Sequence, residues 1–155
     1  MQESMKSTQE RTAIVILGCG RVGSRLAAQL DDEGYHVTVI DTDVYAFRRL
    51  PDTFHGRTIL GTGIDEDVLR RAGIEAARTF IAVTNNDNPN IMAAQIAQTV
   101  FRVPEVLARV YDVERAQTYA ELGMNTICPT ATIAQMFRER VTAGLRPGGP
   151  PSSDG

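Results

Sequence analysis

The sequence predicts a doubly wound α/β domain, in which helices cover both faces of a parallel sheet of about six strands. Short apolar runs alternate with helical patterns along most of the 155 residues, and this alternation is typical of consecutive βαβ units. The first apolar run, at 13–17, leads directly into a glycine-rich turn and a helical pattern. A chain of this length is expected to form one domain with a substantial core.

The expected elements follow one another in a regular order. The predicted strands cover residues 13–17, 36–41, 58–60, 80–83, 106–110 and 126–127. The predicted helices cover 21–33, 43–50, 65–72, about 90–99 and 113–122, and 84–89 is expected to be a polar loop leading into a helix. Asp43 and Asp65 are expected to cap helices, and Gly73 and Gly123 to end them. Right-handed crossovers place the first two helices on one face of the sheet.

A glycine-rich motif, Gly18-Cys19-Gly20-Arg21-Val22-Gly23, joins the first strand to the first helix. In a phosphate-binding turn, the first glycine permits the tight turn and the second lets the backbone approach a pyrophosphate. The third lets the helix pack against the sheet. Free N–H groups at the helix start, together with the helix dipole, favour negative charge there. The alternative is a purely structural glycine turn.

An acidic residue, Asp41, ends the second predicted strand, 18 residues after Gly23. This spacing is close to that of the acid which binds the adenosine ribose in dinucleotide-binding domains. A carboxylate can accept hydrogen bonds from both ribose hydroxyls and repels a 2′-phosphate, so NADP is disfavoured as a ligand. The alternative is that Asp41 caps a helix.

Thr84 and Asn85 follow the fourth predicted strand. In the Rossmann strand order, the fourth strand lies beside the first, and ligands bind in the crevice outside the carboxyl ends of these two strands. We therefore expect both residues to face the glycine-rich turn, where a hydroxyl and an amide suit phosphate or ribose oxygens. The alternative is that the 84–88 segment only caps the next helix.

Three further segments are candidates for the same site. Arg109 is a charge within an apolar strand, so it needs a partner, which is either a nucleotide phosphate or Asp112 or Glu114. The Gly-Thr-Gly segment at 61–63 follows the third strand, where an adenine commonly lies, although a plain turn is an alternative. Arg21 either binds a terminal phosphate, in its own or a neighbouring subunit, or points into solvent.

Composition excludes several classes of function. The net charge is −3 and there is no basic run, so nucleic acid is not an expected partner. The two cysteines, Cys19 and Cys128, give no disulfide framework and no metal cluster, which favours a cytosolic protein. No apolar run approaches the ~18 residues that a membrane span requires, so direct membrane insertion is not expected.

The two ends of the chain differ from its centre. Residues 1–11 are expected to be disordered, 12–142 to form the nucleotide-binding domain, and 143–155 to be a flexible Pro/Gly tail. One face of the last predicted helix is apolar and carries Ile133, Met136, Phe137 and Val141. An apolar helical face must be buried somewhere, so this helix either covers its own sheet or packs on a partner.

An ordered combination of motifs resembles the KTN family of nucleotide-binding domains, also called TrkA-N or RCK, which regulate potassium channels and transporters. The matching segments lie between about residues 13 and 140. They are the glycine motif at 18–23, Val39-Ile40-Asp41-Thr42-Asp43, Val68-Leu69-Arg70-Arg71-Ala72-Gly73-Ile74, Ala82-Val83-Thr84-Asn85, Ala108-Arg109-Val110 and Glu121-Leu122-Gly123. Many relatives carry a second, C-terminal domain, so the chain is either a one-domain regulator or a piece of a longer protein.

The resemblance implies a Rossmann domain that forms a homodimer, or a higher ring, beneath a membrane potassium-translocating subunit. It implies binding of ATP, ADP, AMP or NAD(H), and exchange of the last amphipathic helix across the dimer. Many relatives have an acid where this chain has Thr62, which concerns recognition of the base. The candidate binding residues are Gly18, Cys19, Gly20, Arg21, Val22, Gly23, Asp41, Thr42, Asp43, Gly61, Thr62, Gly63, Thr84, Asn85 and Arg109.

The resulting hypothesis is a cytoplasmic regulatory subunit or domain of a potassium uptake system or channel, held at the inner face of the membrane by its partner. It is not expected to be an enzyme, and no catalytic or metal-binding residues are predicted. The alternative is an NAD-dependent oxidoreductase or a redox-sensing Rossmann protein. Against catalysis, His36 and His55 are the only histidines, and no nucleophile–base pair is evident.

Overall fold

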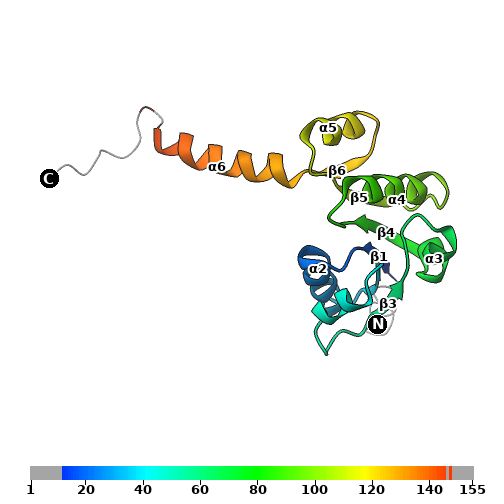
Figure 1. Cartoon of the computed structure of the whole chain (residues 1–155). Helices are drawn as coiled ribbons and strands as arrows, with labels where there is room; N and C mark the ends of the chain where they lie inside the picture. Colours follow the sequence, from blue (N-terminus) through cyan, green and yellow to red (C-terminus); the bar gives the residue numbers. More distant parts are fainter. Residues whose placement is uncertain (1–11, 146, 148–155) are drawn as a thin grey trace, which may run out of the picture.

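The computed structural model describes residues 12–145 and 147 (Figure 1). The 1–11 segment and most of the predicted tail lie outside these ranges. Six parallel strands form one sheet in the order β3-β2-β1-β4-β5-β6. They are β1 (Ala13–Leu17), β2 (His36–Asp41), β3 (Arg57–Leu60), β4 (Ala77–Ala82), β5 (Glu105–Arg109) and β6 (Asn125–Ile127). The order reverses between β1 and β4, which confirms the predicted Rossmann-type fold.

Helices connect successive strands, as the alternating pattern predicts. They are α2 (Arg21–Asp32), the short 3₁₀ helices η1 (Val44–Arg49) and η2 (Ile74–Ala76), α3 (Glu66–Arg71), α4 (Asp87–Thr99), α5 (Val113–Glu121) and α6 (Pro129–Leu145). Asp43 caps η1 by accepting the N–H of Tyr45 at 2.9 Å, and Asp65 caps α3 by accepting the N–H of Asp67 at 2.8 Å. Gly73 and Gly123 adopt the left-handed conformation after α3 and α5.

Two hydrophobic clusters cover the two faces of the sheet. Side chains alternate along β1, so that Ile14 and Ile16 join one cluster whereas Val15 and Leu17 join the other. α2 and η1 contribute to the first cluster, which confirms that the first two helices share a face. α3, α4 and α5 contribute to the second cluster, around the fully buried Phe80. This packing fixes the carboxyl ends of β1, β2 and β4 at one edge.

Several predicted boundaries are wrong. β4 begins at Ala77 rather than at residue 80. The start of the strand was missed because Arg78 and Thr79 are polar and interrupt the apolar run. α4 begins at Asp87 rather than at 90, since a proline is tolerated in the first turn of a helix. α6 continues to Leu145, across the predicted start of the tail at 143.

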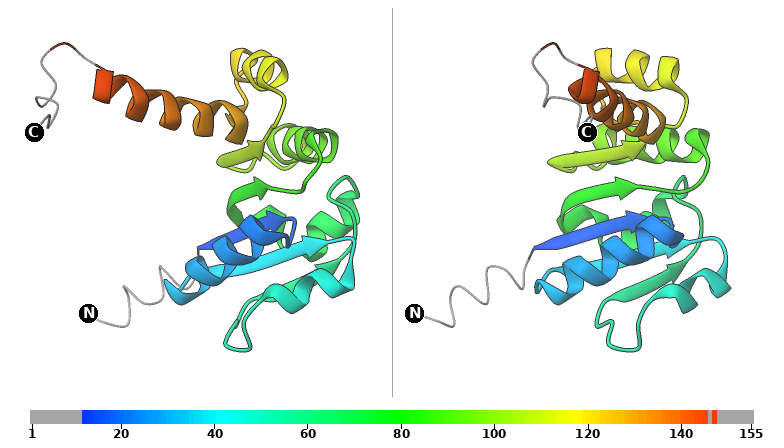
Figure 2. Two further views of the ribbon diagram at one scale, coloured as in Figure 1. Left: turned by 60° about the vertical axis from the view of Figure 1, so that its left-hand side comes forward. Right: turned by 90° about the vertical axis from the view of Figure 1, so that its left-hand side faces the viewer.

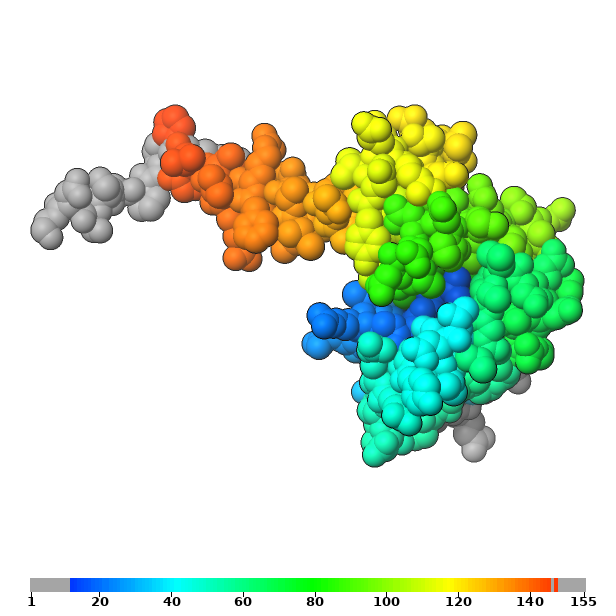
Figure 3. Space-filling model, in the orientation of Figure 1, coloured from blue at the N-terminus to red at the C-terminus, as the bar shows by residue number. Residues whose placement is uncertain are grey.

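The last helix, α6, leaves the domain and buries none of its residues (Figures 1 and 2). Its apolar face is more than half exposed, with Ile133 at 53% and Phe137 at 69%. The space-filling view shows α6 standing clear of the domain (Figure 3). The alternative that this helix covers its own sheet is therefore wrong within this chain.

Candidate functional site

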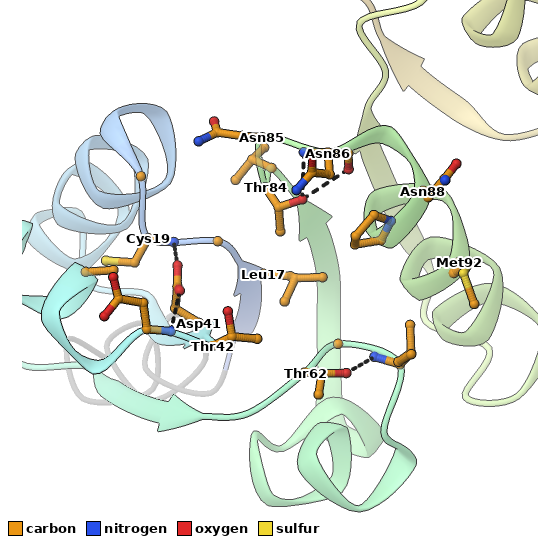
Figure 4. A pocket seen from close by; sticks show the side chains of 18 of the residues that line it. Leu17, Cys19, Asp41, Thr42, Thr62, Thr84, Asn85, Asn86, Asn88 and Met92 are labelled. Carbon is orange, nitrogen blue, oxygen red and sulfur yellow. Dashed lines mark hydrogen bonds between the residues drawn. The ribbon is translucent and has the colours of Figure 1, made fainter.

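A cavity of about 590 Å³ lies at the carboxyl ends of β1, β2 and β4 (Figure 4). Cavities of this size accommodate small ligands. The cavity is lined by Leu17, Gly18, Cys19, Gly20, Asp41, Thr42, Asp43, Ala46, Arg49, Thr62, Gly63, Ile64, Val83, Thr84, Asn85, Asn86, Asn88, Pro89 and Met92. It occupies the point at which the strand order reverses, where open α/β sheets bind ligands.

The glycine-rich turn forms one wall of the cavity. Gly18 has φ +108°, and a Cβ atom there would lie 2.9 Å from the carbonyl oxygen of Val83. A Cβ atom on Gly23 would lie 1.9 Å from the carbonyl oxygen of Gly18, so only glycine lets α2 start this close to the turn. By contrast, a Cβ atom on Gly20 would meet nothing within 4 Å, which leaves open space beside the backbone.

The start of α2 carries no side-chain cap. Gly20 occupies the N-cap position, and the first turn contains no acidic residue. The first helical hydrogen bond runs from the N–H of Ser24 to the carbonyl of Gly20 at 2.9 Å. The N–H groups before Ser24 in this helix therefore have no intrahelical acceptor, and the helix dipole favours an anion at this end.

Asp41 connects the end of β2 to the glycine-rich turn. Its Oδ2 accepts the N–H of Cys19 at 2.8 Å, and its Oδ1 accepts the N–H of Asp43 at 2.8 Å. These bonds hold the carboxylate at the cavity wall (Figure 4), and each oxygen keeps a lone pair for another donor. The alternative that Asp41 caps a helix is wrong, because Asp43 is the residue that caps η1.

Cys19 points into the cluster beneath α2 and is fully buried. Burial, together with the nearby Asp41 carboxylate, raises the pKa of this thiol from 9.0 to about 11, whereas the charge of Arg49 acts in the opposite direction. The thiol is therefore neutral and unreactive near pH 7. This supports a packing role for the Cys19 side chain, while its backbone N–H forms the bond to Asp41.

The opposite wall of the cavity is fixed by Asn90, a fully buried residue of α4. Its Oδ1 accepts both the N–H of Thr84 at 2.9 Å and the hydroxyl of Thr84 at 2.6 Å. Its Nδ2 donates to the carbonyl oxygens of Thr84 at 3.0 Å and Arg109 at 2.9 Å. Asn90 therefore binds both the N–H and the carbonyl of Thr84. The predicted site residues Thr84 and Asn85 line the cavity opposite the glycine-rich turn.

Arg109 is nine-tenths buried behind this wall. Its Nη2 donates to the carbonyl oxygens of Val83 at 2.7 Å and Thr84 at 2.8 Å, and its guanidinium lies 4.9 Å from the centre of the Tyr111 ring. The expectation that Asp112 or Glu114 pairs with Arg109 is wrong, since among the described residues Arg109 forms no ion pair. Asp112 instead caps α5.

The structure gathers most of the predicted residues in the cavity but not all of them. Ten line it: Gly18, Cys19, Gly20, Asp41, Thr42, Asp43, Thr62, Gly63, Thr84 and Asn85. Five do not: Arg21, Val22, Gly23, Gly61 and Arg109. Arg21 and Val22 are exposed on the first turn of α2, and Gly61 lies against Val68. The hydroxyl of Thr62 accepts the N–H of Ile64 at 3.1 Å.

Sequence reasoning missed several lining residues. They are Leu17, Ala46, Arg49, Ile64, Val83, Asn86, Asn88, Pro89 and Met92. A signal existed for Ala46 and Arg49, because residues three apart lie on the same side of a 3₁₀ helix and η1 follows Asp41 directly. Met92 gave no signal, since an exposed methionine on a helix has no particular spacing to the motifs.

The comparison with known families gives the chain its assignment. The sequence model of the TrkA-N domain matches residues 14–129. The chain belongs to the TrkA-N family. This TrkA-N chain is 49% identical over 135 residues to a Trk system potassium uptake protein TrkA of Streptomyces coelicolor, covering 86% of this chain and 60% of that protein. It is 32% identical to a TrkA homolog of Pyrococcus horikoshii, covering 85% and 61%. The chain thus spans about 60% of the length of these relatives.

Solved structures share the fold of this TrkA-N chain. The TrkA-N domain of the Escherichia coli inner membrane protein YbaL matches with a TM-score of 0.73 and 23% identity, covering 84% of this chain and 96% of that one. The Kef C-terminal domain of Shewanella denitrificans, in an AMP-bound form, matches with a TM-score of 0.70 and 20% identity, covering 88% and 83%. GsuK bound to ADP matches with a TM-score of 0.69 and 23% identity, covering 92% and 36%.

Membrane-spanning helices and metal sites are both absent from the described residues. No helix within 12–145 and 147 is long and apolar enough to cross a lipid bilayer. Across the same ranges, no three His, Cys, Asp or Glu side chains are placed to hold a metal ion. The charged groups at the cavity are Asp41, Asp43 and Arg49.

Proposed function

We propose that the cavity binds an adenine nucleotide, either ATP, ADP, AMP or NAD(H). The observation that carries this proposal is the carboxylate of Asp41, held 2.8 Å from the backbone N–H of Cys19 within the glycine-rich turn. A ribose at Asp41 would place its 5′-phosphate beside the open backbone at Gly20 and the uncapped start of α2. Structural neighbours that bind AMP and ADP support this choice of ligand.

The same carboxylate supports a preference for an unmodified ribose. Both oxygens of Asp41 accept backbone N–H groups, so its negative charge is held in place at the cavity wall. A 2′-phosphate would lie against this charge, and like charges at short range are costly outside bulk water. We therefore propose that NADP is a poor ligand.

We propose that nucleotide binding by this chain regulates a potassium uptake system. The support is the 49% identity with the TrkA protein of Streptomyces coelicolor, over 86% of this chain. A nucleotide regulates a partner only if it binds two conformations with different affinities. In this proposal the bound nucleotide favours one arrangement of the assembled domains and so opens or closes the membrane partner.

The cavity lining also supports a non-catalytic role. It contains neither of the two histidines, and its acidic residues Asp41 and Asp43 already accept backbone N–H groups. Its one thiol, that of Cys19, has its pKa raised to about 11, which is unfavourable for a nucleophile. We therefore propose that the chain binds a nucleotide without transforming it.

We propose that two copies pair through α6 and that the pair, or a ring of pairs, acts at the cytoplasmic side of the membrane on a potassium-translocating subunit. The exposed apolar face of α6, which includes Ile133, Met136, Phe137 and Val141, supports this pairing. Such a face is buried in most stable proteins. The membrane partner is supported by the Trk system proteins that this chain resembles.

Calorimetric titration of the purified protein with ATP, ADP, AMP, NAD, NADH and NADP tests the proposal. We expect binding of at least one adenine nucleotide, weaker binding of NADP than of NAD, and no hydride transfer. The Asp41→Ala variant should bind the ribose more weakly, and a Gly20→Val variant should block the phosphate. Full binding by both folded variants would show that the site has been misplaced.

A further inference from the structure

Arg49, the last residue of η1, is the cation among the described residues that line the cavity. Its side chain is exposed, and it forms no hydrogen bond or ion pair with another described residue. Its neighbour Arg48 is also exposed but does not line the cavity. The Arg48 guanidinium lies instead 4.8 Å from the centre of the Tyr45 ring. Two adjacent arginines on one short helix therefore have different surroundings.

The geometry of η1 explains why these neighbours differ. In a 3₁₀ helix, residues three apart lie on the same side. Ala46 is buried and lines the cavity, so Arg49, three residues later, is placed over the same cavity. Arg48 lies one position away and is directed to Tyr45 instead. The Asp43 cap fixes the start of η1 and therefore fixes which arginine faces inward.

Arg49 offsets the negative charge of the cavity lining. Asp41 and Asp43 are both at this wall, so the lining without Arg49 carries two negative charges and no positive one. A phosphate at the glycine-rich turn would be repelled by these carboxylates. The positive charge of Arg49 acts at this turn, since it opposes the rise in the pKa of the Cys19 thiol that burial and Asp41 cause.

We propose that Arg49 is a phosphate-binding residue of this cavity and that it sets the preference of the site for nucleotides with more phosphate groups. The inference rests on the proposed nucleotide binding and adds the group that offsets the two carboxylates. A guanidinium can bind phosphate oxygens in a bidentate manner, and charge-assisted bonds of this kind are strong. Because Arg49 has no partner among the described residues, no existing ion pair must break first.

The test is titration calorimetry of the full chain with adenosine, AMP, ADP and ATP, using wild type, Arg49→Ala, Arg49→Lys and the matched control Arg48→Ala. We expect Arg49→Ala to weaken binding of ADP and ATP roughly tenfold to a hundredfold. Adenosine binding should change less than about twofold, because adenosine has no phosphate to contact. Arg49→Lys should recover part of the loss, and Arg48→Ala should bind like wild type.

Other outcomes separate this inference from the proposed function. Equal affinity of wild type and Arg49→Ala for ADP would overturn the inference and leave nucleotide binding intact. An equal loss in Arg48→Ala, or an equal loss for adenosine, would also overturn it, since it would indicate a general field effect or a contact to the base. If wild type binds none of the four ligands, both the inference and the proposed function are wrong.

Discussion

The side-chain amide of Asn90 donates from Nδ2 to the carbonyl oxygen of Arg109 across 2.9 Å, joining α4 to the carboxyl end of β5. The same amide holds the backbone of Thr84 at the end of β4. One buried side chain thus fixes two adjacent strand ends at the cavity, and Arg109 adds its own bonds to the carbonyls of Val83 and Thr84. The cavity wall that carries Thr84 and Asn85 is therefore held in place by side chains of α4 and β5 that lie behind it.

Replacing Asn90 with leucine should destabilise the fold. The change removes the Asn90 partner of the half-buried N–H of Thr84 and of the buried carbonyl of Arg109, and an unpaired buried group costs about 1–3 kcal/mol. We expect a loss of roughly 3 kcal/mol in the free energy of unfolding, measured by urea denaturation. The control is Asn88→Ala, whose side chain is an exposed partner of Arg115 and should cost less than about 1 kcal/mol. Similar losses in both variants would contradict the role given to Asn90.

Gly18 and Gly73 allow a matched test of the turn. Both have positive φ, at 108° and 83°, but a Cβ atom would be 2.9 Å from backbone atoms at Gly18 and would meet nothing within 4 Å at Gly73. Gly73→Ala should therefore cost about 1–2 kcal/mol for the left-handed backbone alone. Gly18→Ala should cost roughly 3 kcal/mol or more, because the clash adds to the strain. Equal losses in the free energy of unfolding, measured by urea denaturation, would show that the turn shifts to relieve the clash at Gly18.

An Asp41→Asn variant should change ligand preference. The substitution keeps the size of the side chain and removes its negative charge, so repulsion of a 2′-phosphate should fall. It also removes one acceptor, because an amide nitrogen cannot accept the N–H that the second carboxylate oxygen accepts. We expect the ratio of the affinities for AMP and adenosine 2′,5′-bisphosphate to shift at least about tenfold towards the bisphosphate. Asp52→Asn is the control, because it removes the same charge from an exposed residue that does not line the cavity. An unchanged ratio in Asp41→Asn would place the ribose elsewhere.

The buried thiol of Cys19 predicts a pH dependence of stability. Its pKa is about 11 in the folded protein against an ordinary value of 9.0, so between these values the unfolded chain has lost a proton that the folded chain keeps. The thiol contribution to stability is therefore complete below pH 9 and falls as the pH rises towards 11. In urea denaturation between these two pH values, wild type should lose up to about 2 kcal/mol more than Cys19→Ala. Parallel curves for the two proteins would contradict this.

The apolar face of α6 predicts an effect on association. A Met136→Glu, Phe137→Glu double variant places charges on the exposed face, which should prevent its burial against another copy. We expect wild type to sediment as a dimer or larger species and the variant mainly as a monomer. Glu139→Gln is the control, since Glu139 lies away from this face. A wild type that sediments as a monomer at micromolar concentration would contradict pairing through α6.

The fold could be predicted because its signals are local and repeated. Apolar runs alternate with capped helices, and Asp43, Asp65 and Gly73 mark the ends of elements. The glycine-rich turn and Asp41 also carry a fixed spacing that reflects their contact, which the bond between Cys19 and Asp41 confirms. These features determine which strand ends meet, and therefore most of the cavity wall.

The remaining parts depend on contacts between distant segments, which spacing does not reveal. Asn90 sits in the first turns of a helix, where a lone asparagine resembles an exposed residue, yet it is completely buried. Arg109 was expected to have an acidic or phosphate partner, but the carbonyl oxygens of Val83 and Thr84, the two residues that follow β4, accept its hydrogen bonds. The apolar pattern of α6 shows only that one face must be buried. It could not decide whether that face covers the chain's own sheet or packs on a partner.

Only Cys128 separates β6 from the first residue of α6, Pro129, so the orientation of the helix follows that of the sheet edge. The helix has 17 residues and spans roughly 25 Å. Over this length, a tilt of about 10° at Pro129 would displace the far end of the helix by about 4 Å. β6 pairs with β5 up to Arg109, which contacts the cavity wall. A small rotation of the sheet edge at β5 and β6 would thus displace the end of α6 further than it displaces the cavity wall.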